Sequence, residues 1–464
     1  MKAPLLDEEA AGSRSPQTPH RRFSVDVYIK DHAGGWGAYQ RRLERKLQVN
    51  YAFLAVDQLA GIFLVQSMLD ADTDALPLLQ QQWIKATCFF LGGFVGFMTS
   101  GPLADLYGRR PTLLAFNTMR CVTTLVTFAA PSLPVLLVGR CISGVCTNGA
   151  FNTMYPLLAE FAPSDRRARV KRDLGIVWQI GVAYLVIGAY LLRGYSWHAL
   201  ALLFAPSLLA AGWMHDIPES PRFLVVQDRL CEAVAILETA AKVNGHPPPS
   251  LDCELLPRRN VDARIAATGA LGHLQPLFSS GMLPITLGLM ATTFVASGTY
   301  YGLTFAPGST GGGNVYTTQL FSSLLELPAT IGAAYLADAL GRRSSLAILF
   351  GVGALTFLFL GALPFTDRLP ESLGWLPMAA LLTGRASASA ATTLKYVLIS
   401  ESYPTVARSS GIAFLSVFGQ LGGWLAPQAF GVVSNPLLVF AALLALVPCV
   451  LYSCVPETRG KTLV

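Results

Sequence analysis

The sequence predicts an all-α membrane protein with twelve transmembrane helices, arranged as two six-helix halves related by pseudo-two-fold symmetry. The first observation is composition, since 52% of the 464 residues are hydrophobic and 13% are charged, about half the charged fraction of a soluble domain. The second is the recurrence of apolar windows of about 20 residues. The third is an internal repeat, in which a charged hexapeptide after one apolar window returns 233 residues later.

Each predicted helix is an apolar window long enough to cross the hydrocarbon core, where every backbone amide must be hydrogen-bonded within the chain. Six windows lie in each half. Their predicted bounds are 49–70, 83–104, 111–131, 134–160, 174–193, 196–217, 282–304, 316–338, 344–364, 376–400, 410–432 and 435–455.

The repeat is carried by charged motifs at one end of these helices. Asp105-Leu106-Tyr107-Gly108-Arg109-Arg110 is matched by Asp338-Ala339-Leu340-Gly341-Arg342-Arg343. Two further motifs return at nearly the same offset, which identifies the chain as a duplicated unit. They are Tyr155, Glu160, Pro163 and Arg167, matched by Tyr396, Glu401, Pro404 and Arg408, and Pro218-Glu219-Ser220, matched by Pro456-Glu457-Thr458.

Basic residues in short connections predict the orientation, because Lys and Arg near a span resist translocation. They gather at one end of the predicted helices, where one run comprises Arg166, Arg167, Arg169, Lys171 and Arg172. The opposite connections carry Asp70, Asp72 and Asp74 or almost no charge. We therefore expect both termini in the cytosol, in the plasma membrane or an internal vesicle or vacuole membrane. The net charge of +6 is this orientation signal and requires no nucleic-acid partner. We expect a monomer in the lipid bilayer, without metal, cofactor or disulfide.

These boundaries divide the chain into a cytosolic tail (1–48), an N-terminal bundle (49–217), a central cytosolic loop (218–280), a C-terminal bundle (281–455) and a second tail (456–464). In the central loop, Leu230, Val234, Leu237 and Ala241 recur at helical spacing and predict an amphipathic helix. This helix either braces the two halves from below or binds a partner protein.

The local motifs resemble the major facilitator superfamily. Gly101 to Pro111 is similar to its loop 2–3 signature, and Ala334 to Arg343 is similar to the second copy. Within the superfamily, further segments resemble the organic cation/anion transporter group and its synaptic-vesicle-glycoprotein-like relatives, and two motifs shared with sugar porters accompany them. These segments are Gly139 to Glu160, Tyr300 to Leu303, Leu325 to Pro328, Glu401 to Thr405 and Gly419 to Gly423, and the shared motifs begin at Pro218 and Pro456.

Ionisable residues inside spans are the first functional candidates, since a charge at bilayer depth is costly unless it is paired or hydrated. The resemblance implies a pair between Asp57 and Arg140 that binds and releases a coupling proton. The alternative is a static ion pair that joins two helices. We have no role for Arg120, and we expect a structural one for Arg385.

The remaining candidates surround a predicted central cavity. Glu326 either binds a cation or proton there or bonds a neighbouring helix, and Lys395 meets an anionic solute or extends to the inner surface. Gln420 is neutral at a position where organic ion transporters often carry a charge, so it gives no information on the charge of the solute. Four residues could hold a planar or cationic body: Trp178, Gln179, Tyr300 and Tyr301.

The repeated charges predict two salt-bridge rings at the cytosolic ends. If each ring closes only when the two halves meet there, it stabilises the outward-open state; the alternative is that the charges only set topology. One ring comprises Asp105, Gly108, Arg109, Arg110, Glu160, Arg167 and Glu219, and the other Asp338, Gly341, Arg342, Arg343, Glu401, Arg408 and Glu457.

Together these features predict a secondary active transporter, and not an enzyme, that moves a small organic ion or zwitterion by alternating access. Asp57 would couple this movement to protons. The alternatives are a proton-coupled phosphate or sugar carrier, and a non-transporting transceptor of the same fold.

Overall fold

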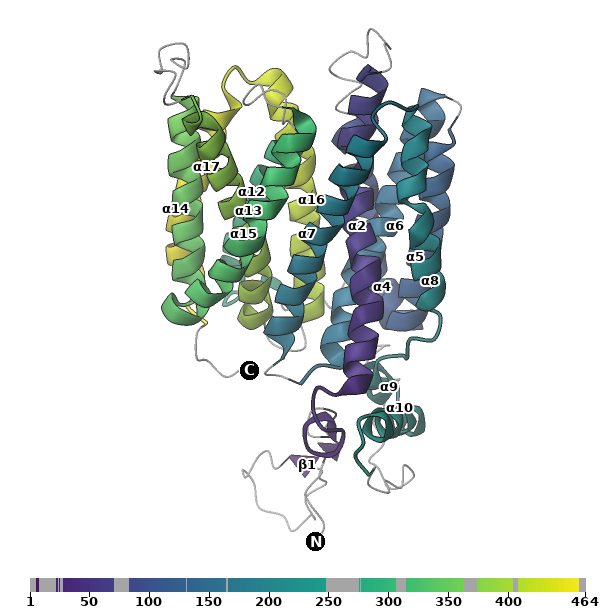
Figure 1. Ribbon diagram of the computed structural model, residues 1–464. Helices are drawn as coiled ribbons and strands as arrows, with labels where there is room; N and C mark the ends of the chain where they lie inside the picture. The colour runs from purple at the N-terminus through teal and green to yellow at the C-terminus, as the bar shows by residue number, and fades with distance from the viewer. Residues whose placement is uncertain are drawn as a thin grey trace.

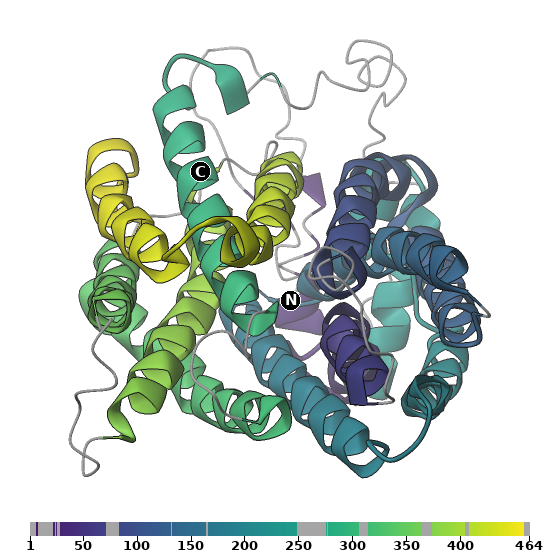
Figure 2. The ribbon, with the colours of Figure 1, turned by 90° about the horizontal axis from the view of Figure 1, so that it is seen from above.

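The computed structural model consists of two groups of long helices side by side (Figures 1 and 2). Helices α2 to α8 form the N-terminal half, and helices α12 to α17 form the C-terminal half. The structure describes residues 6–7, 22–23, 25, 28–70, 83–130, 132–163, 166–247, 275, 277–305, 314–362, 374–403 and 408–458.

The N-terminal half follows a short antiparallel pair of strands, β1 (Leu6–Asp7) and β2 (Arg22–Phe23). Its helical segments are η1 (Tyr28–His32), α2 (Ala38–Asp70), η2 (Trp83–Thr87), α4 (Cys88–Tyr107), α5 (Arg109–Phe128), α6 (Leu133–Glu160), α7 (Arg167–Leu191), η3 (Trp197–Leu203) and α8 (Ala205–Trp213). Two helices, α9 (Pro221–Val226) and α10 (Leu230–Val243), lie below it and define what we call the lower end (Figure 1).

The C-terminal half contains α12 (Leu283–Phe305), α13 (Val315–Leu340), α14 (Arg342–Gly361), α15 (Leu376–Ser402), α16 (Arg408–Val432) and α17 (Pro436–Cys454). The predicted fold is confirmed, because each of the twelve predicted windows overlaps one of the described helical segments. The sixth window differs: 196–217 forms a 3₁₀ segment followed by the short α8 and not one helix.

Seven of these helices are long and apolar enough to cross a membrane within the part of the chain that the structure describes: α2, α4, α6, α7, α13, α14 and α17. Helices α5 and α15 carry buried basic side chains, Arg120 in the first and Arg385 and Lys395 in the second. Such residues lower the mean hydropathy of a span although they face the interior of the bundle.

Glycines allow the closest helix contacts. A Cβ atom on Gly92 of α4 would lie 1.9 Å from the Cys141 backbone oxygen of α6, and one on Gly422 of α16 would lie 2.3 Å from the Phe294 oxygen of α12. Neither site has room for a larger side chain. Small residues therefore set the distance between the helices of each half, as is usual in membranes.

The amphipathic helix is confirmed as α10, and it ends before Gly245, whose φ is +80°. Its buried residues Leu237 and Ala241 pack against Tyr28 and Ile29 of η1. Helix α10 thus braces the chain's own N-terminal segment, which is a correction to the predicted brace between the two halves. α2 begins at Ala38, so the first helix extends into the range 1–48 that we assigned to the tail.

Candidate functional site

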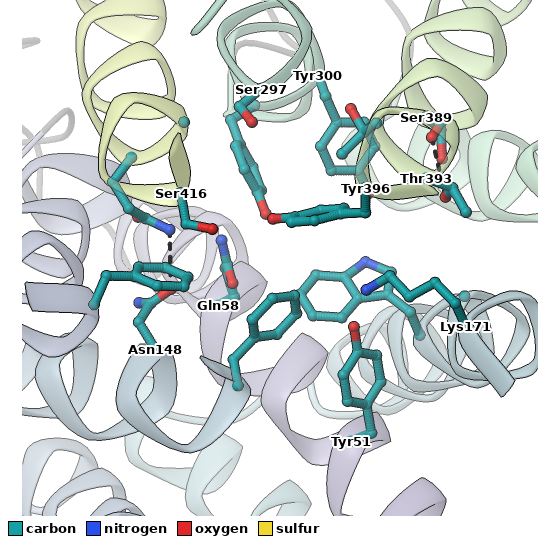
Figure 3. Close-up of a pocket in the computed structure, with 18 of the residues that line it drawn as sticks. Tyr51, Gln58, Asn148, Lys171, Ser297, Tyr300, Ser389, Thr393, Tyr396 and Ser416 are labelled. Carbon is teal, nitrogen blue, oxygen red and sulfur yellow. Dashed lines mark hydrogen bonds between the residues drawn. The ribbon is translucent and has the colours of Figure 1, made fainter. Parts of the chain in front are cut away.

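A cavity lies between the two halves (Figure 3). Helices of both halves contribute to its wall. The lining residues are Tyr51, Gln58, Phe97, Asn148, Phe151, Lys171, Gly175, Trp178 and Gln179 from the N-terminal half, and Ser297, Tyr300, Tyr301, Ser389, Thr392, Thr393, Tyr396, Ser416, Gly419 and Gln420 from the C-terminal half.

Helical periodicity explains why these residues share one wall. On α7, Lys171, Gly175, Trp178 and Gln179 are spaced by about one or two turns, so one stripe of the helix faces the cavity. Ser389, Thr392, Thr393 and Tyr396 form a similar stripe on α15. Each stripe carries polar and aromatic side chains at helical spacing, so this side of each helix faces the cavity and not lipid.

Aromatic rings form a continuous part of the wall. The Trp178 ring meets the rings of Tyr51 and Phe151 edge-on, with centroids 5.9 and 6.1 Å away. Tyr300 and Tyr301 of α12 meet at 5.0 Å on the opposite side. Rings at these separations attract one another and offer flat surfaces to a planar solute.

Two glutamines in the cavity wall each donate a hydrogen bond to a residue of the opposite half. Gln420 Nε2 of α16 donates to Asn148 Oδ1 of α6 at 3.0 Å. Gln179 Nε2 of α7 donates to Glu326 Oε2 of α13 at 2.7 Å and to Ser389 Oγ of α15 at 3.4 Å. Gln179 and Gln420 are separated by the repeat offset of 241, as are Asn148 and Ser389, so the two bridges are related by the internal symmetry.

Five of the nine predicted substrate or coupling residues line the cavity: Trp178, Gln179, Tyr300, Tyr301 and Gln420. The other four are buried behind its wall: Asp57, Arg140, Glu326 and Lys395. The aromatic and amide candidates therefore line the cavity, whereas the charged candidates do not.

The predicted pairing of the Asp57 carboxylate with Arg140 is wrong. The Asp57 carboxylate instead forms an ion pair with Arg120 of α5 and accepts a hydrogen bond from Thr124 at 2.7 Å. Arg140 Nη1 donates to the Asp57 backbone oxygen at 3.0 Å, and its guanidinium lies 4.7 Å from the Phe89 ring centroid. The Asp57 carboxylate points toward α5 and away from the cavity, whereas the side chain of its neighbour Gln58 lines the cavity.

In the C-terminal half, Glu326 forms an ion pair with Arg385, with Arg385 Nε 3.1 Å from Glu326 Oε1. Arg385 Nη2 also donates to Gln319 Oε1 at 2.6 Å. Glu326 therefore bonds neighbouring helices, which is the second of the two roles that we considered for it. Gln179 connects this ion pair to the cavity wall.

The two interior lysines depart from their predicted positions. Lys395, expected at the inner surface or on a solute, is fully buried and donates to Ser297 Oγ at 2.5 Å. Lys171, which we counted only among the orientation charges, lines the cavity with its ammonium 4.4 Å from the Tyr396 ring centroid. The helical spacing from Lys171 to Trp178 was the signal that could have identified it.

At the lower end, the first repeated motif forms a charge cluster. Arg109 contacts Asp105 at 3.0 Å and Glu160 at 3.6 Å. Glu219 accepts the backbone N–H groups of Arg109 and Arg110 at 3.1 and 3.2 Å. Burial raises the pKa of the Glu219 carboxyl above its ordinary value, against the lowering effect of these N–H donors.

The second motif forms the same cluster in the other half. Arg342 contacts Asp338 and Glu401, each at 3.2 Å, and Glu457 accepts the backbone N–H groups of Arg342 and Arg343 at 2.9 and 3.1 Å. These contacts lie within one half, as expected for one cluster in each half, and the gating role of the two clusters stays a prediction. The side chains of Arg167 and Arg408 lie outside the described residues.

The glycine of each cluster has a positive φ, +109° at Gly108 and +96° at Gly341. A Cβ on Gly108 would lie 2.3 Å from Glu219 Oε2, and one on Gly341 would lie 2.7 Å from Glu457. We expect Gly108→Ala and Gly341→Ala each to destabilise the protein by about 1–3 kcal/mol, measured as a lower melting temperature in detergent.

Gly351→Ala on α14 is the matched control, because a Cβ there meets no atom within 4 Å. Its melting temperature should stay within error of the wild type or rise. Equal melting temperatures for all three variants would show that the two glycines are not required by the charge clusters.

One disulfide expectation is also corrected, since Cys231 of α10 is disulfide-bonded. The other described cysteines are free: Cys88, Cys121, Cys141, Cys146, Cys449 and Cys454. Sequence spacing does not reveal which cysteines a folded loop brings together.

The sequence matches the family described as "Sugar (and other) transporter" over residues 46–464. It is 34% identical to solute carrier family 22 member 7 of Rattus norvegicus, over 75% of this chain and 63% of the relative. It is 30% identical to member 1 of Oryctolagus cuniculus, over 81% and 67%, and 28% identical to an organic cation transporter protein of Drosophila melanogaster, over 85% and 70%. The chain thus spans about two thirds of the length of these relatives.

Solved structures show the same fold. The proton:xylose symporter XylE of the major facilitator superfamily, bound to 6-bromo-6-deoxy-D-glucose, superposes with a TM-score of 0.69 at 18% identity, over 92% of this chain and 98% of XylE. An inward open conformation of XylE from E. coli gives 0.68 at 19% identity, over the same shares. The chain therefore belongs to the sugar (and other) transporter family and to solute carrier family 22, and it is a multi-pass membrane protein.

Proposed function

We propose that this protein is a secondary active transporter, which carries a small organic solute through the central cavity by alternating access. The observation that carries the proposal is a cavity whose wall comes from both halves. When such halves rock against each other, a solute held between them is exposed first at one end and then at the other. The family assignment supports the same activity.

The contacts between the halves include aromatic contacts and a side-chain hydrogen bond, which can break and reform. Above the cavity, Phe90 of α4 meets Tyr301 and Phe305 of α12, with ring centroids 5.0 and 5.8 Å away. Thr87 of η2 and Gln428 of α16 share a hydrogen bond of 2.8 Å. Each such hydrogen bond contributes about 1 kcal/mol net, so breaking this one costs little free energy.

The lining favours an organic solute with a planar body and hydrogen-bond donors. Trp178, Tyr51 and Phe151 supply aromatic surface. The Oε1 atoms of Gln179 and Gln420 are buried without a partner among the described residues. An N–H or O–H group of the solute would satisfy these oxygens, whose unbonded state costs free energy.

A sugar carrier is the second candidate, because four amide side chains line the cavity: Gln58, Asn148, Gln179 and Gln420. Amides can hydrogen-bond the hydroxyl groups of a hexose, and the solved neighbour XylE is a xylose symporter by its description. A phosphate carrier and a transceptor that binds without transport are the remaining alternatives.

Proton coupling is a separate part of the proposal. Asp57 is a candidate carrier of the proton, but its ion pair with Arg120 lies behind the cavity wall. Coupling through Asp57 would therefore require a conformational change that opens a path from the cavity to its carboxylate.

We further propose that the lower end faces the cytosol. Arg109, Arg110, Arg342 and Arg343 lie there in the charge clusters, and basic residues near spans stay on the cytosolic side. We also propose that the protein acts as a monomer, in the plasma membrane or an internal vesicle or vacuole membrane.

Flux into proteoliposomes tests the function. Purified protein should accumulate one member of a labelled panel of aromatic acids, aromatic cations, glucose and phosphate, and an excess of the same unlabelled solute should abolish the signal. Binding without flux, measured on the same preparation, would show a transceptor. Uptake of glucose or phosphate alone would support the second class of carrier instead.

A further inference from the structure

The charge of the cavity wall is set by one residue. Lys171 is the one charged side chain among the described residues that line the cavity. Figure 3 shows it extending from α7 toward Tyr396 of the opposite half. Its ammonium also lies 4.8 Å from the Tyr155 ring centroid and 5.5 Å from that of Phe151, so aromatic faces surround it.

The carboxylates inside the bundle do not neutralise Lys171, because each has another partner. Asp57 pairs with Arg120, and Glu326 pairs with Arg385. No carboxylate of the described residues forms an ion pair with Lys171.

A second lysine lies beside the same ring. Lys395 Nζ lies 5.2 Å from the same Tyr396 ring centroid and donates to Ser297, which lines the cavity. Both lysines thus face one ring, and the described ion pairs include neither of them. Gln58 Nε2 adds a buried N–H donor without a partner to the same wall.

An anionic ligand would complete this arrangement. Aromatic faces compensate only part of the desolvation of a buried ammonium. A carboxylate or sulfonate group within hydrogen-bond distance forms a charge-assisted bond with it, which is stronger than a neutral one. A cationic ligand would instead meet the like charge of Lys171, and no carboxylate is among the described residues that line the cavity.

We propose that the cavity selects organic anions, with Lys171 binding the carboxylate or sulfonate group and Trp178, Tyr51 and Phe151 packing against a planar body. This inference rests on the proposed transport function and adds the charge of the solute to it. Lys171 is a binding and specificity residue for that solute.

Three probes with fused bicyclic aromatic rings of similar size and different charge test the inference on the full-length protein: 2-naphthoate, neutral 2-naphthamide and cationic N-methylquinolinium. Equilibrium dialysis in detergent measures their binding, and proteoliposome uptake measures their flux. Wild-type protein should bind 2-naphthoate about tenfold more tightly than either other probe. Tighter binding of N-methylquinolinium would overturn the inference without any variant.

Variants at Lys171 give the second comparison. Lys171→Gln should lower 2-naphthoate affinity by about tenfold with little change for 2-naphthamide, Lys171→Arg should retain the preference, and Lys171→Glu should shift it toward N-methylquinolinium. Lys242→Gln on α10 is the control for loss of a lysine at a distance from the cavity. Unchanged 2-naphthoate affinity in a folded Lys171→Gln protein would contradict the assignment.

The two measurements separate this inference from the proposed function. If 2-naphthoate binds to the wild type, depends on Lys171 and is not moved, transport is wrong and the anion site is right. If N-methylquinolinium is moved and 2-naphthoate is not, transport is right and the anion site is wrong.

Discussion

Asp57→Asn is expected to destabilise the protein by about 3–5 kcal/mol, because it leaves Arg120 as a buried cation without its carboxylate. Both side chains are fully buried, at 0% exposure. Asn117 Oδ1 accepts from Arg120 Nε at 3.1 Å, but a neutral amide cannot replace the lost charge. The expected readout is a lower melting temperature in detergent and a smaller yield of folded protein.

A double-mutant cycle separates this structural role from proton coupling. Arg120→Met alone should also destabilise, whereas Asp57→Asn with Arg120→Met removes both charges and should recover most of the lost melting temperature. Additive losses in the double variant would show that the two residues do not act as a pair.

The same double variant decides the proton question. If Asp57 only stabilises the bundle, the recovered protein should transport with the pH dependence of the wild type. If Asp57 carries the coupling proton, the recovered protein should exchange solute between preloaded compartments but no longer accumulate it along a pH gradient.

Ser416→Trp is expected to abolish most transport while the fold survives. Ser416 is buried on α16, lines the cavity and donates to the Ile412 oxygen of its own helix at 2.7 Å. An indole at this position would occupy the space beside Asn148 and Gln58 where the solute binds. Each 1.4 kcal/mol of steric cost lowers the rate about tenfold, so uptake should fall by at least about tenfold.

Leu209→Trp is the matched control, since Leu209 on α8 is 80% exposed on the outer surface of the bundle. Both variants should elute as single species with melting temperatures close to that of the wild type. Normal uptake by a folded Ser416→Trp protein would mean that the solute does not pass through this cavity.

Hydropathy and the internal repeat predicted the fold well, because both depend on local sequence. Lipid requires about 20 apolar residues in each span, and most predicted windows end within a few residues of the observed helices. The charge clusters could also be predicted, since Glu219 and Glu457 occupy equivalent positions in the two copies. The short length of α8 could not be predicted, because its window is as apolar as a full span.

The charges of the site were harder to predict, because depth in the membrane does not determine direction. Asp57 and Gln58 are neighbours in sequence, yet the second faces the cavity and the first faces Arg120 of α5. Lys171 was grouped with four nearby arginines as an orientation charge, although its spacing from Trp178 places it on the cavity face of α7. Which side chains meet across two helices depends on the rotation of each helix, and sequence periodicity defines that rotation only relative to the same helix.

A cross-link across the upper end tests the central claim, that the solute crosses by alternate opening of the cavity between the halves. Thr87 and Gln428 are hydrogen-bonded there across the halves. Thr87→Cys with Gln428→Cys is placed in a variant whose native cysteines are replaced and which still transports, and a short cleavable thiol cross-linker joins the pair. If the solute crosses in this way, cross-linking stops uptake and cleavage of the linker restores it. Full uptake by completely cross-linked protein would show that the halves need not separate at this end.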